Sequence, residues 1–167
     1  MKTEKSKNKI RVSFDLDETL FVDPQTYKTE TRPMFPFNII FKERLRLGTV
    51  RLIHELQKEG FEVWVYTSSF RSEQYIKLLF LYYNVKFNGL INATRHQKEV
   101  QSGHKEILPQ KMPNKYHISL HVDDEEVICS YGREYGFDTY NLNKEDDKWV
   151  EKILLAARKS KEKRFKR

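Results

Sequence analysis

Two carboxylates, Asp15 and Asp17, are the residues best placed to do chemistry. They follow a segment, residues 10–14, in which apolar and polar residues alternate as in a β-strand. Ligands of open α/β sheets bind at the carboxyl ends of the strands, where this pair lies. Because residues two apart in an extended chain point to opposite faces, both can serve one centre only if the backbone turns sharply after Asp15. Taken alone, an Asp-x-Asp pair is more typical of an acidic turn that caps a strand.

Polar side chains also follow two later predicted strands. One strand, rich in valine and aromatic residues, ends at Thr67 and Ser68, and another ends at Asp123 and Asp124. In a doubly wound sheet these strand ends converge on one crevice. Four carboxylates gathered without a cation would repel one another, so the sequence predicts a divalent cation. Oxygen ligands that leave room for water favour Mg²⁺.

A magnesium ion beside hydroxyl and lysine donors is suited to a phosphate group, whose charge the cations offset. An aspartate can attack phosphorus directly and form an aspartyl-phosphate, which divides hydrolysis into two steps. A second aspartate that is not fully ligated can protonate the leaving oxygen and later deprotonate water. This division of roles gives a reason for an Asp-x-Asp-x-Thr sequence at the end of a strand.

The elements that position these residues alternate between strand and helix, which predicts one doubly wound, Rossmann-like α/β domain. We expect a central parallel sheet of about five strands with helices on both faces. The predicted strands span residues 10–14, 61–66, 85–91, 116–122 and 137–142. A helix is predicted to begin at Thr49 and stop at Gly60, and the last helix is predicted to be capped by Asn143. Residues 92–115 are predicted to be a loop with at most one short helix.

The length of 167 residues fits a single domain. The net charge of +7 is concentrated at the two ends: residues 1–9 carry +3 and residues 158–167 carry +6, which leaves residues 10–157 at about −2. We therefore expect a basic amino-terminal tail (1–9), a folded domain (10–157) and a basic carboxyl-terminal tail (158–167). Such tails could bind nucleic acid, but tails that keep the protein soluble are the preferred interpretation.

The spacing between the predicted motifs leaves no room for a second folded domain that could cap the site. Residues 20–46 contain three prolines and an aromatic group, and they are predicted to form an irregular arm or small hairpin. The aromatic residues Phe35, Phe37 and Phe41 are expected to pack this arm onto the core, with a part in the substrate wall as the alternative. The site should therefore be open, which permits a macromolecular phosphate as substrate without requiring one.

These residues together resemble the haloacid dehalogenase (HAD) superfamily. The resemblance rests on Asp15-Leu16-Asp17-Glu18-Thr19 after an apolar strand, Thr67 after a second strand, a downstream lysine, and Asp123-Asp124 after a fourth strand. One Asp-x-Asp-x-Thr segment is moderately specific, whereas all four motifs in this order are a strong signal. The resemblance covers the chain from about residue 10 to residue 155.

If the chain is similar to this superfamily in chemistry, the resemblance implies Asp15 as nucleophile and metal ligand. Asp17 would be the acid/base, with its backbone carbonyl on the metal, and Asp123 with Asp124 would complete the metal site. Thr19, Thr67 and Ser68 would then contact the substrate phosphate. Because dehalogenases usually lack the second acid, the resemblance implies a phosphatase.

The phosphate-binding lysine is less clearly defined. Lys105, Lys111 and Lys115 lie between the third and fourth predicted strands, and Lys111, twelve positions before Asp123, is most similar to the family motif. His121, two positions before Asp123, is expected to be a strand residue that packs or hydrogen-bonds near the site. The spacing of the five histidines matches no standard zinc motif.

The leading hypothesis is a Mg²⁺-dependent phosphohydrolase that acts on an unidentified phosphorylated substrate. The alternatives are a catalytically idle HAD-like binding module and a phosphatase for nucleic-acid or nucleotide phosphates that uses the basic tails. Intact Asp15 and Asp17 argue against an idle module. No apolar run reaches the length of a membrane span, no signal-peptide pattern is visible, and there is a single cysteine, Cys129. These features predict a soluble cytoplasmic protein without a membrane partner.

Overall fold

A five-stranded parallel sheet forms the centre of the protein, which is described here from a computed structural model that covers residues 9–165. The strand order is β3-β2-β1-β4-β5, so the strand that precedes the acidic turn lies in the middle. The strands are β1 (Arg11–Phe14), β2 (Glu62–Tyr66), β3 (Gly89–Ile91), β4 (Ile118–Asp123) and β5 (Asp138–Asn141). The predicted doubly wound α/β architecture is confirmed.

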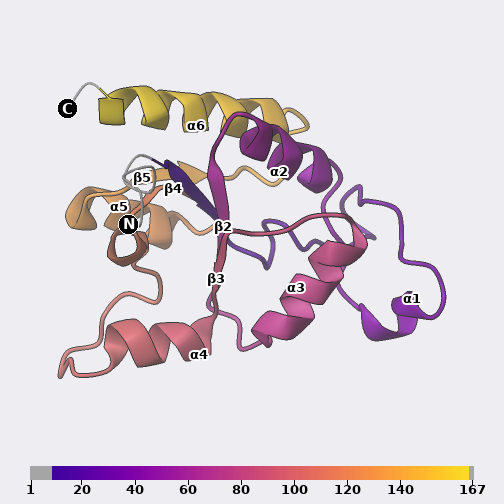
Figure 1. Cartoon of the computed structure of the whole chain (residues 1–167), viewed down its shortest axis with the longest axis horizontal. Coiled ribbons are helices and arrows are strands. Elements are labelled where there is room, and N and C mark those ends of the chain that lie inside the picture. Colours follow the sequence, from indigo (N-terminus) through magenta and orange to yellow (C-terminus); the bar gives the residue numbers. More distant parts are fainter. Residues whose placement is uncertain (1–8, 166–167) are drawn as a thin grey trace, which may run out of the picture.

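Helices cover both faces of this sheet (Figure 1). One face carries the main apolar core, in which residues of the central strands such as Val12 and Phe14 pack against α2, α3 and α6. The other face is covered by α4, α5 and two short helical turns. The helices are α1 (Phe37–Ile40), α2 (Thr49–Lys58), α3 (Glu73–Tyr82), α4 (Ala93–His96), α5 (Glu126–Tyr135) and α6 (Trp149–Phe165), with a π-helical turn (Gln97–Gln101) and a 3₁₀ turn (Pro113–Tyr116) before β4.

The second face of the sheet is polar near the centre. Because side chains alternate along a strand, Ser13 on β1 and His121 and Asp123 on β4 point away from the apolar core. All three side chains are fully buried, and Tyr66 on β2 packs beside His121. Buried polar groups need hydrogen-bond partners, so this face is the natural place for a polar network.

The predicted boundaries differ most from the observed ones at two elements. The third strand begins at Gly89 rather than at residue 85, and a Cβ at Gly89 would lie 2.3 Å from the Trp64 ring. The last helix begins at Trp149, not after Asn143, because Asn143 and Asp146 each accept a hydrogen bond from the backbone two residues later and form consecutive turns. Asn143 therefore belongs to a turn before the helix and does not cap it.

The segment predicted as a loop, residues 92–115, is more helical than expected. Asn92 caps α4 by accepting a hydrogen bond from the Arg95 N–H at 2.9 Å. The chain then continues into the π-helical turn, and the 3₁₀ turn precedes β4. No second folded unit stands over the sheet within residues 9–165, in agreement with the expected absence of a cap.

The arm at residues 20–46 contains one short helix, α1, and isolated bridges between Phe21 and Leu45 and between Thr29 and Arg46 join its two ends. Phe41 is buried and packs against the rings of Phe37, Tyr75 and Tyr82. Two of the three aromatic residues therefore attach the arm to α3, as expected. Phe35 differs, since it is 76% exposed.

The basic carboxyl-terminal segment is not a tail over its described part, which corrects the prediction. Helix α6 continues to Phe165, and Ser160 on its inner side is buried. Arg158 pairs with Glu59 at 2.6 Å, and Arg164 donates a hydrogen bond to Ser119 Oγ at 2.7 Å. The many charged residues of this segment masked the helical pattern of its buried positions in the sequence. The predicted amino-terminal tail lies outside the described residues except for Lys9, which pairs with Glu62.

We also searched the helices for a possible membrane span. Within residues 9–165, none combines the length and the apolar character that crossing a bilayer requires.

Candidate active site

Asp15 directly follows β1 at the carboxyl edge of the sheet. Its backbone N–H donates to the Val122 carbonyl at 3.0 Å, so the ladder between β1 and β4 extends to this residue. The next residues form a tight turn in which the Leu16 carbonyl accepts hydrogen bonds from three backbone N–H groups. Glu18 in this turn has a left-handed backbone with φ of 58°. The sharp turn expected after Asp15 is therefore present.

Three carboxylates converge at this edge. One oxygen from each of Asp15, Asp123 and Asp124 lies within 4.8 Å of the other two. Asp15 comes from the end of β1, Asp123 from the end of β4, and Asp124 from the loop that follows. The parallel pairing of β1 with β4 brings residues more than 100 positions apart in the sequence to one point.

Lys111 neutralises part of this charge. Its ammonium lies 2.9 Å from Asp15 Oδ1 and 2.6 Å from Asp123 Oδ2, and its side chain is 1% exposed. Burial disfavours the ammonium, but the two carboxylates outweigh this and raise the pKa of Lys111. Of the three lysines considered from the sequence, Lys111 is the one in the cluster, while Lys105 and Lys115 are exposed.

Burial affects the two carboxylates beside Lys111 differently. It raises the pKa of Asp15 to about 6, against the opposing charge of Lys111. Burial also disfavours the charged form of Asp123, but hydrogen bonds from His121 and Lys111 and the nearby positive charge bring the pKa of Asp123 to about 2. Asp123 is therefore the permanently charged member of the pair.

His121 fixes the position of the Asp123 carboxylate by a hydrogen bond. Its Nε2 lies 2.9 Å from Asp123 Oδ2, and its Nδ1 lies 2.7 Å from Ser13 Oγ. A carboxylate oxygen only accepts, so the Nε2 nitrogen carries the proton and Nδ1 accepts from the serine hydroxyl. Burial lowers the pKa of His121, which favours this neutral form. Sequence reasoning expected His121 to hydrogen-bond near the site, but nothing in the sequence signalled Ser13.

Asp17 lies apart from the three clustered carboxylates. Its side chain is 50% exposed, and its Oδ2 accepts a hydrogen bond from Arg71 at 2.8 Å. Arg71 also pairs with Glu43 of the arm at 2.7 Å. Arg71, in the loop after β2, thus joins the side chain of Asp17 to the arm, while Asp15 belongs to the buried cluster. Arg71 was missed because only the fold brings it to Asp17.

The three hydroxyl residues predicted to contact phosphate take different positions. Thr19 is buried and donates a hydrogen bond to Asp124 Oδ1 at 3.3 Å. Thr67, at the end of β2, is buried and accepts a hydrogen bond from the Ser69 N–H at 3.1 Å. Ser68 is exposed. Thr19 therefore orients an acid of the cluster, and Thr67 shapes the loop that carries Arg71.

Two further basic residues contact the acidic turn. The sequence did not indicate either of them. Lys144, after β5, lies 3.0 Å from Asp124 Oδ2 and 3.3 Å from Glu18 Oε2. Arg46, from the arm, is buried and donates to the backbone carbonyls of Thr19 and Lys144. These contacts connect three segments distant in sequence, and no local pattern marks them.

The donor set fits a hard divalent cation. Asp15 Oδ1 is buried and lies 2.9 Å from the Lys111 ammonium, and no other donor among the described residues reaches it. Asp123 uses both lone pairs of Oδ2 for Lys111 and His121, whereas Oδ1 accepts a single hydrogen bond, from the Glu125 N–H. Free carboxylate lone pairs at one point are what Mg²⁺ requires. Asp15, Asp123 and Asp124 are therefore the residues that could hold it.

Comparison with solved structures reveals similar folds. The chain resembles a HAD-superfamily hydrolase of subfamily IA from Geobacter sulfurreducens, with a TM-score of 0.51 and 13% identity over 78% of this chain and 88% of that chain. It also resembles the HAD domain of the effector protein Lem4 from Legionella pneumophila, solved as an inactive mutant, with a TM-score of 0.52 and 17% identity over 95% of this chain and 99% of that chain. An uncharacterized protein from Listeria monocytogenes gives a TM-score of 0.53 and 17% identity over 90% and 99%.

No protein-family model matches the sequence. No curated protein matches it either. Sheet order, strand-end acids and structural neighbours nevertheless agree, and the chain has a HAD-like fold.

Proposed function

We propose that the protein is a Mg²⁺-dependent phosphohydrolase that cleaves phosphate monoesters. The observation that carries this proposal is the position of Asp15, whose carboxylate is buried at the sheet edge between Lys111 and two further acids. A nucleophilic carboxylate must face an electrophile, and the adjacent cationic groups attract an anionic one. Phosphate is the anionic electrophile that suits this set of groups.

In the proposed reaction, Asp15 attacks phosphorus and the bond between phosphorus and the ester oxygen breaks. The proton that the leaving oxygen needs comes from Asp17, which must first leave Arg71. Water then attacks the phosphorus of the aspartyl-phosphate and gives its proton to Asp17. This second step releases inorganic phosphate and restores the Asp15 carboxylate.

The other residues of the site orient these groups. Lys111 lies 2.9 Å from Asp15, so its positive charge would lower the repulsion between this carboxylate and an incoming phosphate. A magnesium ion held by Asp15, Asp123 and Asp124 would supply further positive charge beside the phosphate. Thr19 fixes Asp124, and His121 fixes Asp123.

The experiment is phosphate release from an aryl phosphate and from a panel of metabolite and nucleotide phosphates, with Mg²⁺ or with EDTA. We expect turnover that requires Mg²⁺, disappears in Asp15→Asn and persists in Asp147→Asn, a matched change at an exposed aspartate outside the site. With an aryl phosphate whose phenolate leaves without a proton, Asp17→Asn should accumulate a phosphorylated enzyme, detectable by mass and sensitive to hydroxylamine. Full activity in Asp15→Asn would overturn the proposal, as would a lack of turnover on every substrate in the panel.

A further inference from the structure

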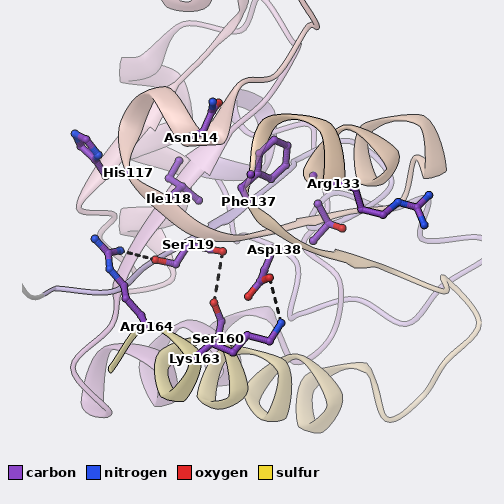
Figure 2. Close-up of a pocket in the computed structure, with 13 residues that line it drawn as sticks. Asn114, His117, Ile118, Ser119, Arg133, Phe137, Asp138, Ser160, Lys163 and Arg164 are labelled. Atoms are coloured by element: carbon purple, nitrogen blue, oxygen red, sulfur yellow. Dashed lines mark hydrogen bonds and ion pairs between the residues drawn. The ribbon is translucent and has the colours of Figure 1, made fainter. Parts of the chain in front are cut away.

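A second concave region lies at the amino edge of the sheet, at the opposite end of β4 from the acidic cluster. It is a pocket of about 620 Å³ between the starts of β4 and β5, the end of α5 and the last turns of α6 (Figure 2). Its polar lining includes Ser119, Arg133, Asp138, Ser160, Lys163 and Arg164. None of these residues belongs to the candidate active site.

Two local features of the chain create this pocket. The register between β1 and β4 shifts after Arg11, so Ser119 is an extra residue without a partner on β1. Its side chain accepts a hydrogen bond from Arg164, and its carbonyl accepts one from Ser160. In α5, a Cβ at Gly132 would lie 2.6 Å from the Phe137 carbonyl, so glycine lets the helix approach β5 closely.

The pocket has more positive than negative charge. Lys163 pairs with Asp138 at 3.2 Å, which balances one cation. Arg164 donates to the neutral Ser119 hydroxyl, and across residues 9–165 neither Arg164 nor Arg133 pairs with a carboxylate. Two guanidinium groups therefore lack a counter-charge. Guanidinium groups bind phosphate oxygens with paired hydrogen bonds, so this lining favours a ligand with phosphate groups.

The arrangement of the cations indicates the shape of that ligand. Figure 2 shows Arg164 and Arg133 on opposite sides of the pocket, with Ser119, Ser160 and the Lys163–Asp138 pair between them and the Arg133 side chain extending outward from the rim. Ile118 and Phe137, both buried, supply an apolar part of the wall. An elongated ligand with negative charge at more than one point matches cations on opposite sides of this lining. The volume is that of a pocket for a nucleotide-sized molecule.

We propose that this amino-edge pocket binds a small oligophosphate, either a free pyrophosphate-type anion or the phosphate chain of a nucleotide. The site is separate from the reaction proposed at Asp15. It is joined to that site by β4, which runs from Ser119 at the pocket to Asp123 in the acidic cluster. The proposal does not depend on the proposed phosphatase activity.

The test is isothermal titration of the metal-free full chain with pyrophosphate and, separately, with ADP. We expect both ligands to bind, and Arg164→Gln and Arg133→Gln each to weaken binding by about tenfold or more, because each removes a charged phosphate contact. The matched control is Lys159→Gln, which removes the same charge from an exposed residue of α6 that does not line the pocket. Asp15→Asn should bind both ligands as tightly as the wild type. Tighter binding of ADP than of pyrophosphate would identify the nucleotide as the source.

Four results would overturn the proposal. Binding that is lost in Asp15→Asn but retained in Arg164→Gln would place the oligophosphate in the candidate active site. An equal loss in Lys159→Gln would show diffuse attraction to α6. A single-stranded oligonucleotide that binds more tightly than either small ligand would point to a nucleic-acid surface. Absence of binding by both ligands to the folded wild-type chain is the fourth. Arg133 is exposed, so Arg133→Gln should fold even if Arg164→Gln does not.

Discussion

The candidate active site has a buried half and an exposed half. In the buried half, the side chains of Asp15, Lys111 and Asp123 are between 0 and 6% exposed and contact one another. In the exposed half, Asp17 is 50% exposed and its partner Arg71 is 30% exposed. A buried ionised group has no water to replace a lost partner, whereas an exposed one does. The buried half should therefore be essential for folding and chemistry, and the exposed half for chemistry alone.

The largest effect should come from Lys111→Met, which breaks the buried half. This change leaves Asp15 and Asp123 without their shared cation, and removing one partner of a buried ion pair lowers the free energy of unfolding by about 3–5 kcal/mol. This loss in the free energy of unfolding is measured by urea unfolding at pH 7.5, followed by circular dichroism. The control Lys115→Met removes an exposed ammonium and should change stability by less than about 0.5 kcal/mol. Equal stability of the two variants would remove the distinction between the halves.

Asp17→Asn should separate catalysis from stability. Loss of a general acid/base lowers kcat by about 10²–10⁴-fold. The exposed pair with Arg71 stabilises the fold little, so the free energy of unfolding should change by no more than about 1 kcal/mol. Steady-state kinetics and urea unfolding on the same preparation give both numbers. A variant that unfolds as readily as Lys111→Met, or one that keeps wild-type kcat, would contradict the assignment of Asp17 to the exposed half.

His121→Leu tests whether the buried half depends on the residue behind it. The change leaves Asp123 Oδ2 and Ser13 Oγ each without one hydrogen-bond partner, which should cost about 1–3 kcal/mol of stability. If Asp123 holds a metal, loss of its orienting partner should weaken Mg²⁺ binding by about 10–100-fold. Titration calorimetry measures the Mg²⁺ affinity directly and does not depend on catalytic activity. Ser13→Ala should give a smaller loss, and unchanged Mg²⁺ affinity in His121→Leu would show that His121 acts in folding alone.

The sequence was sufficient to place the buried half of the site. Asp15 and Asp123 each follow an apolar strand, and the strand pattern is local, so both strand ends could be predicted before their pairing was known. The convergence of those ends then follows from the parallel sheet. Lys111 was the preferred lysine because it is most similar to the family motif, and the structure brings it to both acids.

The exposed half could not be predicted in the same way. The orientation of Asp17 depends on Arg71, which in turn depends on Glu43 of the arm, and these three residues lie on separate loops. Lys144 and Arg46 likewise reach the acidic turn from distant segments. Hydrophobic periodicity reports burial on regular elements and carries no information on which polar loop side chains meet. The extent of α6 was missed for a related reason, since a run of lysines and arginines conceals the inward-facing Ser160.

The smallest effect concerns His96, which supports the buried half through one intermediate residue. The Tyr66 hydroxyl accepts a hydrogen bond from the N–H of Met112, the residue after Lys111, and its oxygen also lies within hydrogen-bond distance of His96 Nδ1. A neutral ring can accept the hydroxyl proton at Nδ1, and burial lowers the pKa of His96 below its ordinary value. Because the unfolded chain then binds the proton more readily, stability should fall as the pH drops through about 6.5.

In His96→Asn, which cannot titrate, the loss of stability between pH 7 and pH 5 should be shallower than in the wild type. The difference in slope is bounded by one proton, about 1.4 kcal/mol per pH unit. Urea unfolding at a series of pH values measures it, and exposed His104→Asn should keep the wild-type slope. A steeper loss of stability in His96→Asn would mean that the ring is protonated in the folded protein, and Tyr66 would then not be donating to it. The Tyr66 hydroxyl oxygen would then accept hydrogen bonds from both the His96 ring and the Met112 N–H.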